Sequence, residues 1–245
     1  MGTAGYRLRL RRLRAAILVA LLVLVAQFVT ARYQAREQIP VQLTTDVLSN
    51  TTQNAPRALE ALGSLEVKGR APKTGYARSE FGDGWAEVAG CDMRNIMLKR
   101  GMSDVELSED GCVVLRGTLQ DVYTDSTILF VRGSTTSDAV QIDHVVALSD
   151  AWQKGAQQLT STERTQFAND PLNLLAVDGP ANQQKADSDA ASWLPPNKNF
   201  RCAYIARQIA VKQKYRLWVT EAEKAVMTRV LNGCSEQTLP VELLL

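Results

Sequence analysis

Short apolar runs alternate with polar and turn-forming residues over most of the chain after residue 90. Runs rich in β-branched residues predict strands at residues 113–116, 127–132, 140–142 and 174–177. Apolar residues at helical spacing, together with capping boxes that open at Thr160 and Thr220, predict helices at residues 91–98, 149–158, 160–169, 180–185, 200–215 and 222–231. The first two strands form a hairpin across residues 123–126. Strands and helices mixed in this order indicate the α+β class.

Polar side chains with useful chemistry stand at the ends of the last two predicted strands. Asp143 and His144, the one histidine of the chain, end the strand at 140–142. Asn173 opens the next strand, and Asn182 follows nine residues later on a helix. A neutral imidazole can accept a proton near pH 7, and carboxylate and amide oxygens are ligands for hard cations. Each residue alone also suits an ordinary turn or helix-start position.

The first 31 residues are typical of an export signal. Five arginines and no acidic residue precede or flank the apolar run 15–26. This run matches the core of a signal peptide, and its extension to Ala31 reaches the low end of a membrane span. Both a cleaved signal peptide and a retained membrane anchor stay open. In either case the positive-inside rule places the rest of the chain outside the cytoplasm.

The remainder divides into three parts. Residues 32–71 are polar and interrupted and predict a stalk or linker, with one helix near 56–62. Residues 72–234 form the compact domain, and 235–245 are a short tail. The chain has a formal net charge of +2, yet without the five N-terminal arginines 23 basic residues face 26 acidic ones. A polyanion would therefore have to meet a local patch or a metal ion.

Four cysteines agree with export, because disulfides persist in oxidising compartments. Four cysteines allow three pairings. Proximity along the chain favours Cys91–Cys112 and Cys202–Cys234. A zinc site is the rival interpretation, but it lacks a Cys-x-x-Cys pair.

The three segments 143–146, 173–177 and 181–185 resemble the core of an HNH endonuclease. The wider context is similar to a group of exported bacterial HNH-family proteins, through Trp85 and the segments 81–82, 90–95, 111–114, 151–152 and 193–196. The resemblance covers residues 72–234. It implies a ββα-metal (HNH) core within a small disulfide-linked domain, with a flanking hairpin and C-terminal helices.

The resemblance also implies roles for the polar residues. His144 would act as the general base, and Asp143 and Asn182 would hold a divalent metal, Mg²⁺ or alternatively Mn²⁺. Asn173 would orient the imidazole through the backbone near His144, with Asn169 as the competitor for that role. The products would carry 5′-phosphate and 3′-hydroxyl ends, and no small-molecule cofactor is expected.

Contacts with nucleic acid are expected from basic residues, namely Lys185, Arg201, Arg207 and Lys212. A solvated helix face is the alternative for all four. Asp92 and Arg94 lie in a matching segment, but the sequence assigns them no chemistry. The leading hypothesis is an exported, metal-dependent endonuclease that cuts DNA. An inactive, envelope-tethered binding module and an RNase are the alternatives, and a retained N-terminal segment would add the membrane as a partner.

Overall fold

The computed structural model describes residues 21, 23–27, 30 and 55–240. The chain separates into two compact units, Met1–Asn54 and Ala55–Leu245. The described residues of the first unit are helical. Most of the predicted signal segment, the stalk up to residue 54 and the tail after 240 lie outside the described residues. Within the described part, no helix has the length and apolar character that crossing a membrane requires.

A three-stranded antiparallel sheet and one helix form most of the smaller core of the second unit, which Val140, Ile142, Leu174 and Ala176 complete. Its strand order is β3-β4-β5, with β3 at Met102–Leu107, β4 at Val114–Gln120 and β5 at Thr127–Val131. The predicted hairpin is confirmed, because β4 pairs with β5. Helix α4 (Met93–Gly101) is capped by Asp92, whose carboxylate accepts a hydrogen bond from the Asn95 N–H. Met97 and Leu98 of α4 pack with Phe130 of β5.

A second, two-stranded sheet carries the Asp-His pair. Strands β6 (Val140–His144) and β7 (Leu174–Asp178) run antiparallel, with Asp143 opposite Leu175 and His144 opposite Leu174. Helix α7 (Gly179–Lys185) follows β7 without a break, and the Asp178 side chain caps it. The order strand, strand, helix agrees with the predicted elements, and Asp143 and His144 belong to the strand itself.

The long connection between β6 and β7 is helical. Helix α5 (Leu148–Trp152) is shorter than the predicted helix 149–158, because Gly155 takes a φ of 123° and the chain resumes as the 3-10 turn η3 (Ala156–Gln158). Helix α6 (Ser161–Ala168) has the predicted capping box, with reciprocal Thr160 and Glu163 bonds. Five shorter elements complete the connections: η1 (Arg78–Phe81), β1 (Glu87–Val88), β2 (Cys91–Asp92), η2 (Ser137–Ala139) and η4 (Lys198–Phe200).

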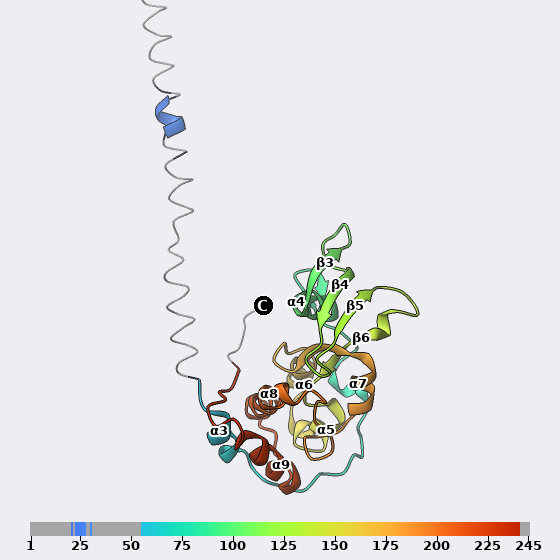
Figure 1. Cartoon of the computed structure of the whole chain (residues 1–245), viewed down its shortest axis with the longest axis vertical. Coiled ribbons are helices and arrows are strands. Elements are labelled where there is room, and N and C mark those ends of the chain that lie inside the picture. Colours follow the sequence, from blue (N-terminus) through green and yellow to red (C-terminus); the bar gives the residue numbers. More distant parts are fainter. Residues whose placement is uncertain (1–20, 22, 28–29, 31–54, 241–245) are drawn as a thin grey trace, which may run out of the picture. The chain divides into compact units, whose positions relative to one another are not determined.

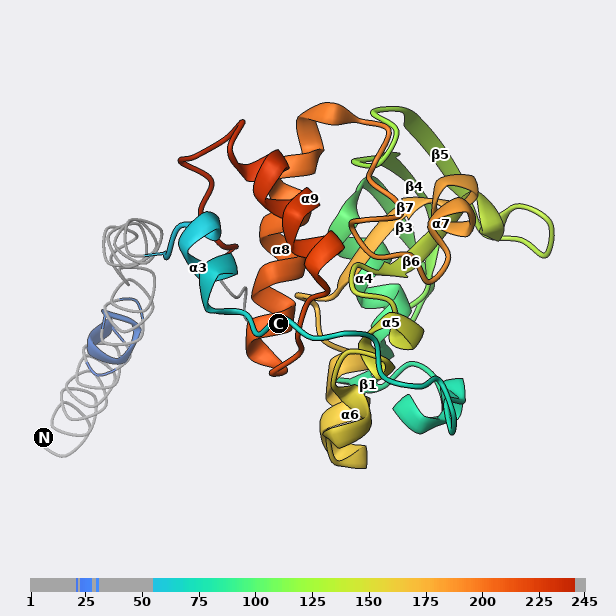
Figure 2. The same cartoon turned by 90° about the horizontal axis from the view of Figure 1, so that it is seen from below.

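The larger core surrounds α8 (Arg201–Lys214), with α9 (Glu221–Leu231) and α3 (Ala58–Ser64) packed beside it (Figure 1). Figure 2 shows these three helices on one side of the domain and the strands on the other. The predicted boundary at 72 is therefore wrong: Ala58 and Leu62 are buried in the core, and the Ala58 N–H donates to the Gln237 carbonyl. Residues 55–71, which the sequence assigns to the stalk, belong to the second unit.

Both predicted disulfides are present. Cys91–Cys112 joins β2 to the turn before β4, and Cys202–Cys234 joins the start of α8 to the segment after α9. No cysteine is free. Each bond closes a loop of 21 or 32 residues, and closing such a loop restricts the unfolded chain.

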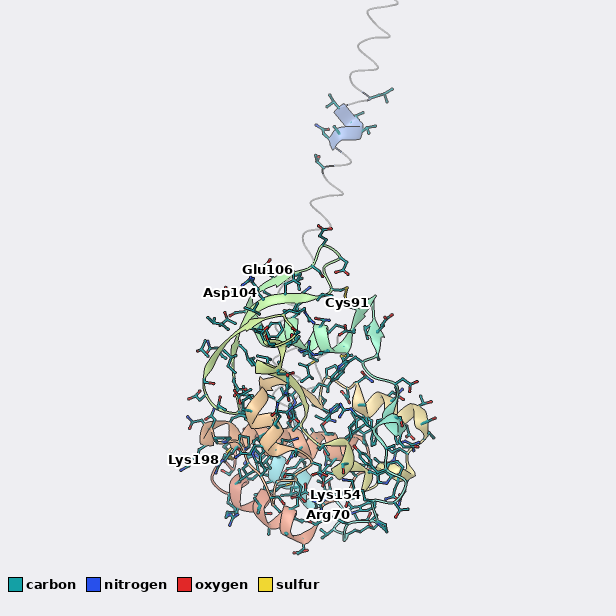
Figure 3. All side chains as sticks on the ribbon, turned by 90° about the vertical axis from the view of Figure 1, so that its right-hand side faces the viewer. Arg70, Cys91, Asp104, Glu106, Lys154 and Lys198 are labelled. Carbon is teal, nitrogen blue, oxygen red and sulfur yellow. A yellow bond between two sulfur atoms is a disulfide. The ribbon has the colours of Figure 1, made fainter. Side chains whose placement is uncertain are left out.

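A buried ionic cluster ties α5, α8 and α9 together. The Lys154 ammonium is fully buried and lies 2.7–2.8 Å from carboxylate oxygens of Asp150, Asp189 and Glu223. Lys212 and Arg70 supply the other two positive charges. Figure 3 labels Arg70 and Lys154, which share Asp150 and Asp189 as partners. Three cations and three anions thus balance one another, and all of them except Arg70 are buried.

Lys154→Met should destabilise the protein strongly, because it leaves three buried carboxylates with two cations. We expect the free energy of unfolding to fall by about 3–5 kcal/mol, measured by denaturant unfolding of the oxidised protein. Lys198→Met is the matched control, because Lys198 is exposed and exposed substitutions change stability by roughly 0.5 kcal/mol or less. Equal losses for the two variants would contradict the stabilising role of the cluster.

Candidate active site

His144 ends β6 with its imidazole buried against two neighbours. Its Nε2 lies 2.9 Å from the carbonyl oxygen of Ala168, at the end of α6. A carbonyl oxygen only accepts, so Nε2 carries the hydrogen and Nδ1 keeps its lone pair. The ring of Trp85 stacks parallel to the imidazole, with centroids 5.8 Å apart.

The same surroundings keep the imidazole uncharged. The pKa of His144 is lowered from 6.5 to about 3, chiefly because the ring is buried. The hydrogen bond with Ala168 opposes this shift, and the charges of Arg78 and Lys185 add to it. The ring is therefore neutral at pH 7, and Nδ1 can accept a proton.

Asn173 fixes the backbone that follows His144. Its side chain is fully buried, its Oδ1 accepts from the Val146 N–H at 2.8 Å, and its Nδ2 donates to the Val146 and Phe167 carbonyls. Asn169 instead bonds to the Ala86 N–H and the Thr165 carbonyl. The residue that holds the segment after His144 is thus Asn173, in the place that the sequence indicates.

Asp143 is buried, and both of its carboxylate oxygens already accept a hydrogen bond. Tyr123 donates its hydroxyl to Oδ2 at 2.5 Å, and the Lys185 ammonium lies 2.9 Å from Oδ1. Burial raises the pKa of Asp143, whereas the Lys185 charge and the two hydrogen bonds act in the opposite direction. Each oxygen has a second lone pair, so these bonds leave acceptor capacity.

The prediction that Lys185 and Lys212 contact nucleic acid is wrong. Both side chains are fully buried. The Lys185 ammonium bonds to Asp143 and to the His144 carbonyl at 2.8 Å, and Lys212 belongs to the buried ionic cluster. Arg201 and Arg207 are half-buried and donate to backbone carbonyls of Pro195, Pro171 and Leu172. Their contact with nucleic acid stays a prediction.

Asp143, His144 and Asn182 line one cavity of about 470 Å³. Asn182 is half-buried, and its Nδ2 donates to Gln141 Oε1 at 2.9 Å, which leaves its carbonyl oxygen as an acceptor. A second cavity of about 370 Å³ adjoins the first through shared walls, Arg78, Trp85, His144 and Leu148. The imidazole thus lies where the two hollows meet.

The donor set suits a hard cation better than zinc. Asp143 and Asn182 offer one carboxylate and one amide oxygen to the cavity, and Mg²⁺ is held by one or two carboxylates while it keeps several waters. Among the described residues, His, Cys, Asp and Glu side chains form no group of three that could hold a metal. The Lys185 charge beside Asp143 opposes cation binding, so a metal here would bind weakly.

Sequence reasoning missed several parts of this site. Tyr123 lies in the hairpin turn, and nothing in its local pattern predicts a bond to Asp143. Trp85 and Arg94 fall within segments of the stated resemblance, which gave them no role. Arg78 lines both cavities from η1 and had no sequence signal.

Comparison with known proteins shows which family the chain belongs to. The family described as GmrSD restriction endonucleases, C-terminal domain, matches residues 93–230, which is more than half of the chain. The chain belongs to this family. A relative from the fungus Arthroderma benhamiae, named "Uncharacterized secreted protein", is 37% identical over 190 residues, which cover 75% of this chain and 89% of the relative. The family is therefore a nuclease family. The relative is fungal, whereas the sequence resembles exported bacterial proteins.

The region that matches the family of GmrSD restriction endonucleases, C-terminal domain (GmrSD_C), includes most of the candidate site residues. Asp143, His144, Asn173 and Asn182 all lie inside residues 93–230, as does Lys185. Arg78 and Trp85 precede the matched region, so this chain adds one wall of the cavity from outside the family domain.

The imidazole should stay neutral over the whole physiological pH range. Because the folded pKa lies near 3 and the ordinary value is 6.5, the unfolded chain binds the extra proton first as the pH falls. The stability that His144 contributes above pH 6.5 is therefore lost between 6.5 and about 3. A ¹⁵N NMR titration of the metal-free protein in EDTA has one imidazole to follow and should show an Nε2–H tautomer. A midpoint at 6.5 or above would contradict this environment.

Proposed function

We propose that this GmrSD_C-family protein is an exported, metal-dependent endonuclease that hydrolyses DNA by HNH-type chemistry. The observation that carries the proposal is the state of His144. Its Nε2 is bound to the Ala168 carbonyl, and its Nδ1 is left as an acceptor beside a cavity that Asp143 and Asn182 also line. Membership of a nuclease family supports the same reaction class.

In this proposal the chain's own residues activate water. His144 accepts a proton from the attacking water at Nδ1, which is neutral at pH 7 because of burial. Asn173 holds the backbone after β6, so that the ring keeps its angle. Trp85 covers one face of the ring and restricts its rotation. The attacking water would thus meet a base whose position is already fixed.

Asp143 and Asn182 would hold the divalent cation, Mg²⁺ or alternatively Mn²⁺. A bound cation supplies positive charge that stabilises the phosphodiester as negative charge develops. Tyr123 and Lys185 fix the Asp143 carboxylate, so its rotamer is set before any cation arrives. The products expected by resemblance carry 5′-phosphate and 3′-hydroxyl ends.

Export is supported by two independent features. Two disulfides link the domain, and disulfides are rare in reducing compartments. The relative from Arthroderma benhamiae is named as a secreted protein. We propose that this chain also works outside the cytoplasm, with its N-terminal segment either cleaved or retained as an anchor.

One observation favours a second candidate, a binding module that hydrolyses nothing. Asp143, the proposed metal ligand, already accepts bonds from Tyr123 and Lys185. If that carboxylate does not bind a cation, the fold would keep the cavity without the metal. The nuclease proposal is preferred because the chain belongs to a nuclease family and His144 is unprotonated and oriented beside the cavity.

Oxidised full-length protein should nick supercoiled plasmid with Mg²⁺ or Mn²⁺ and stop when EDTA is added. His144→Ala should lower kcat by roughly 10²-fold or more, the usual contribution of a general base. Because the chain has one histidine, no second imidazole can replace it. The unfolding midpoint of the variant serves as the folding control.

Two outcomes would reject the enzyme. One is wild-type protein that leaves DNA and RNA intact with every divalent cation tested. The other is a folded His144→Ala variant that cuts as fast as wild type. A parallel assay on single-stranded RNA decides between a DNase and an RNase.

A further inference from the structure

Two arginines at the candidate site have no structural task. Arg94, in the first turn of α4, lines the cavity of Asp143 and Asn182, and Arg78 of η1 lines both cavities. In the part of the chain that the structure describes, neither guanidinium makes a hydrogen bond or an ion pair. Most other described arginines do, for example Arg70, Arg132 and Arg164.

The position of Arg94 makes this informative. The side chain is half-buried, and a guanidinium taken from water without a partner is costly. Burial lowers the pKa of Arg94, as does the charge of Arg132, whereas Asp92 and Asp138 act in the opposite direction. Arginine nonetheless stays charged at neutral pH. The five N–H donors of the Arg94 guanidinium therefore lie at the cavity without an acceptor among the described residues.

The charges around the cavity leave a positive balance. Three aspartates line it, but Asp143 is paired with Lys185 and Asp187 with Lys73. Asp138 remains, against the two arginines. The domain as a whole has no excess of positive charge, so this local balance is where an anion would meet least repulsion.

We propose that Arg94 and Arg78 bind two phosphates of the nucleic-acid backbone on either side of His144. The inference rests on the proposed nuclease function and names the groups that hold its substrate. Arg94 shares the cavity of Asp143 and Asn182, so it binds the scissile phosphate. Arg78 lies at the junction of the two cavities and binds the neighbouring phosphate. A planar guanidinium suits this task, because it donates two parallel hydrogen bonds to one phosphate.

Binding is tested first, without cleavage. Arg94→Gln, Arg78→Gln and wild type are compared by fluorescence anisotropy on a labelled DNA duplex in EDTA, over a range of salt. Each variant should bind more weakly and reduce the slope of log affinity against log salt by about 0.9, the value for one phosphate contact. Arg100→Gln and Arg229→Gln are matched controls, because both arginines are exposed and lie on α4 and α9; they should keep the wild-type slope.

Cleavage then separates the two roles. Arg94→Gln should lower kcat by roughly 10²-fold, as the loss of a donor to developing charge does, and Arg94→Lys should not restore it, because lysine lacks the fork. Arg78→Gln should raise KM and leave kcat nearly unchanged. Unfolding midpoints equal to those of the controls exclude misfolding as the cause.

The outcomes of the two experiments test the arginine assignment separately from the proposed nuclease function. Wild type that cuts, with Arg94→Gln and Arg78→Gln equal to the controls, overturns the arginine assignment and leaves the nuclease intact. Wild type that binds DNA without cutting overturns the nuclease, and the binding slopes then decide the arginines. Wild type that neither binds nor cuts overturns both.

Discussion

The candidate site depends on one buried ammonium group. Lys185, the last residue of α7, lies within hydrogen-bond distance of the Asp143 carboxylate and of the His144 carbonyl. It thereby ties the end of a helix to the end of a strand more than 40 residues earlier. A buried cation without such partners would be strongly unfavourable. The position of α7 and the conformation of β6 at its last two residues are therefore coupled.

This coupling has an electrostatic consequence. Burial raises the pKa of the Asp143 carboxyl group, and the Lys185 charge opposes that rise and favours the ionised form. The same positive charge lowers the pKa of His144. One group thus favours an ionised carboxylate and a neutral imidazole next to each other. The proposed chemistry would require both states, an unprotonated base and an ionised metal ligand. In the proposed enzyme, the same positive charge would weaken the binding of a cation at Asp143.

Local signals in the sequence predicted the elements and not the pairing of buried charges. The Thr160 capping box, the hairpin and both disulfides depend on neighbours or on chain proximity, and all are present. The Thr220 box forms only in part, because Thr220 accepts from the Glu223 N–H while the Glu223 carboxylate turns to Lys154. Lys185 and Lys212 looked like surface residues for the same reason. Their partners lie far away in sequence, and no periodicity indicates them.

The burial of so many cations changes how the protein can meet a polyanion. Carboxylates inside the domain form ion pairs with Lys154, Lys185 and Lys212. Several arginines, including Arg201 and Arg207, donate hydrogen bonds to backbone carbonyls instead. A count of basic residues therefore overstates the positive surface. What is left near His144 is Arg78 and Arg94, on elements outside the ββα segment. A phosphate backbone would then be attracted to the cavity and not to a helix face. In the proposed enzyme, a domain with little net charge would still attract nucleic acid toward His144.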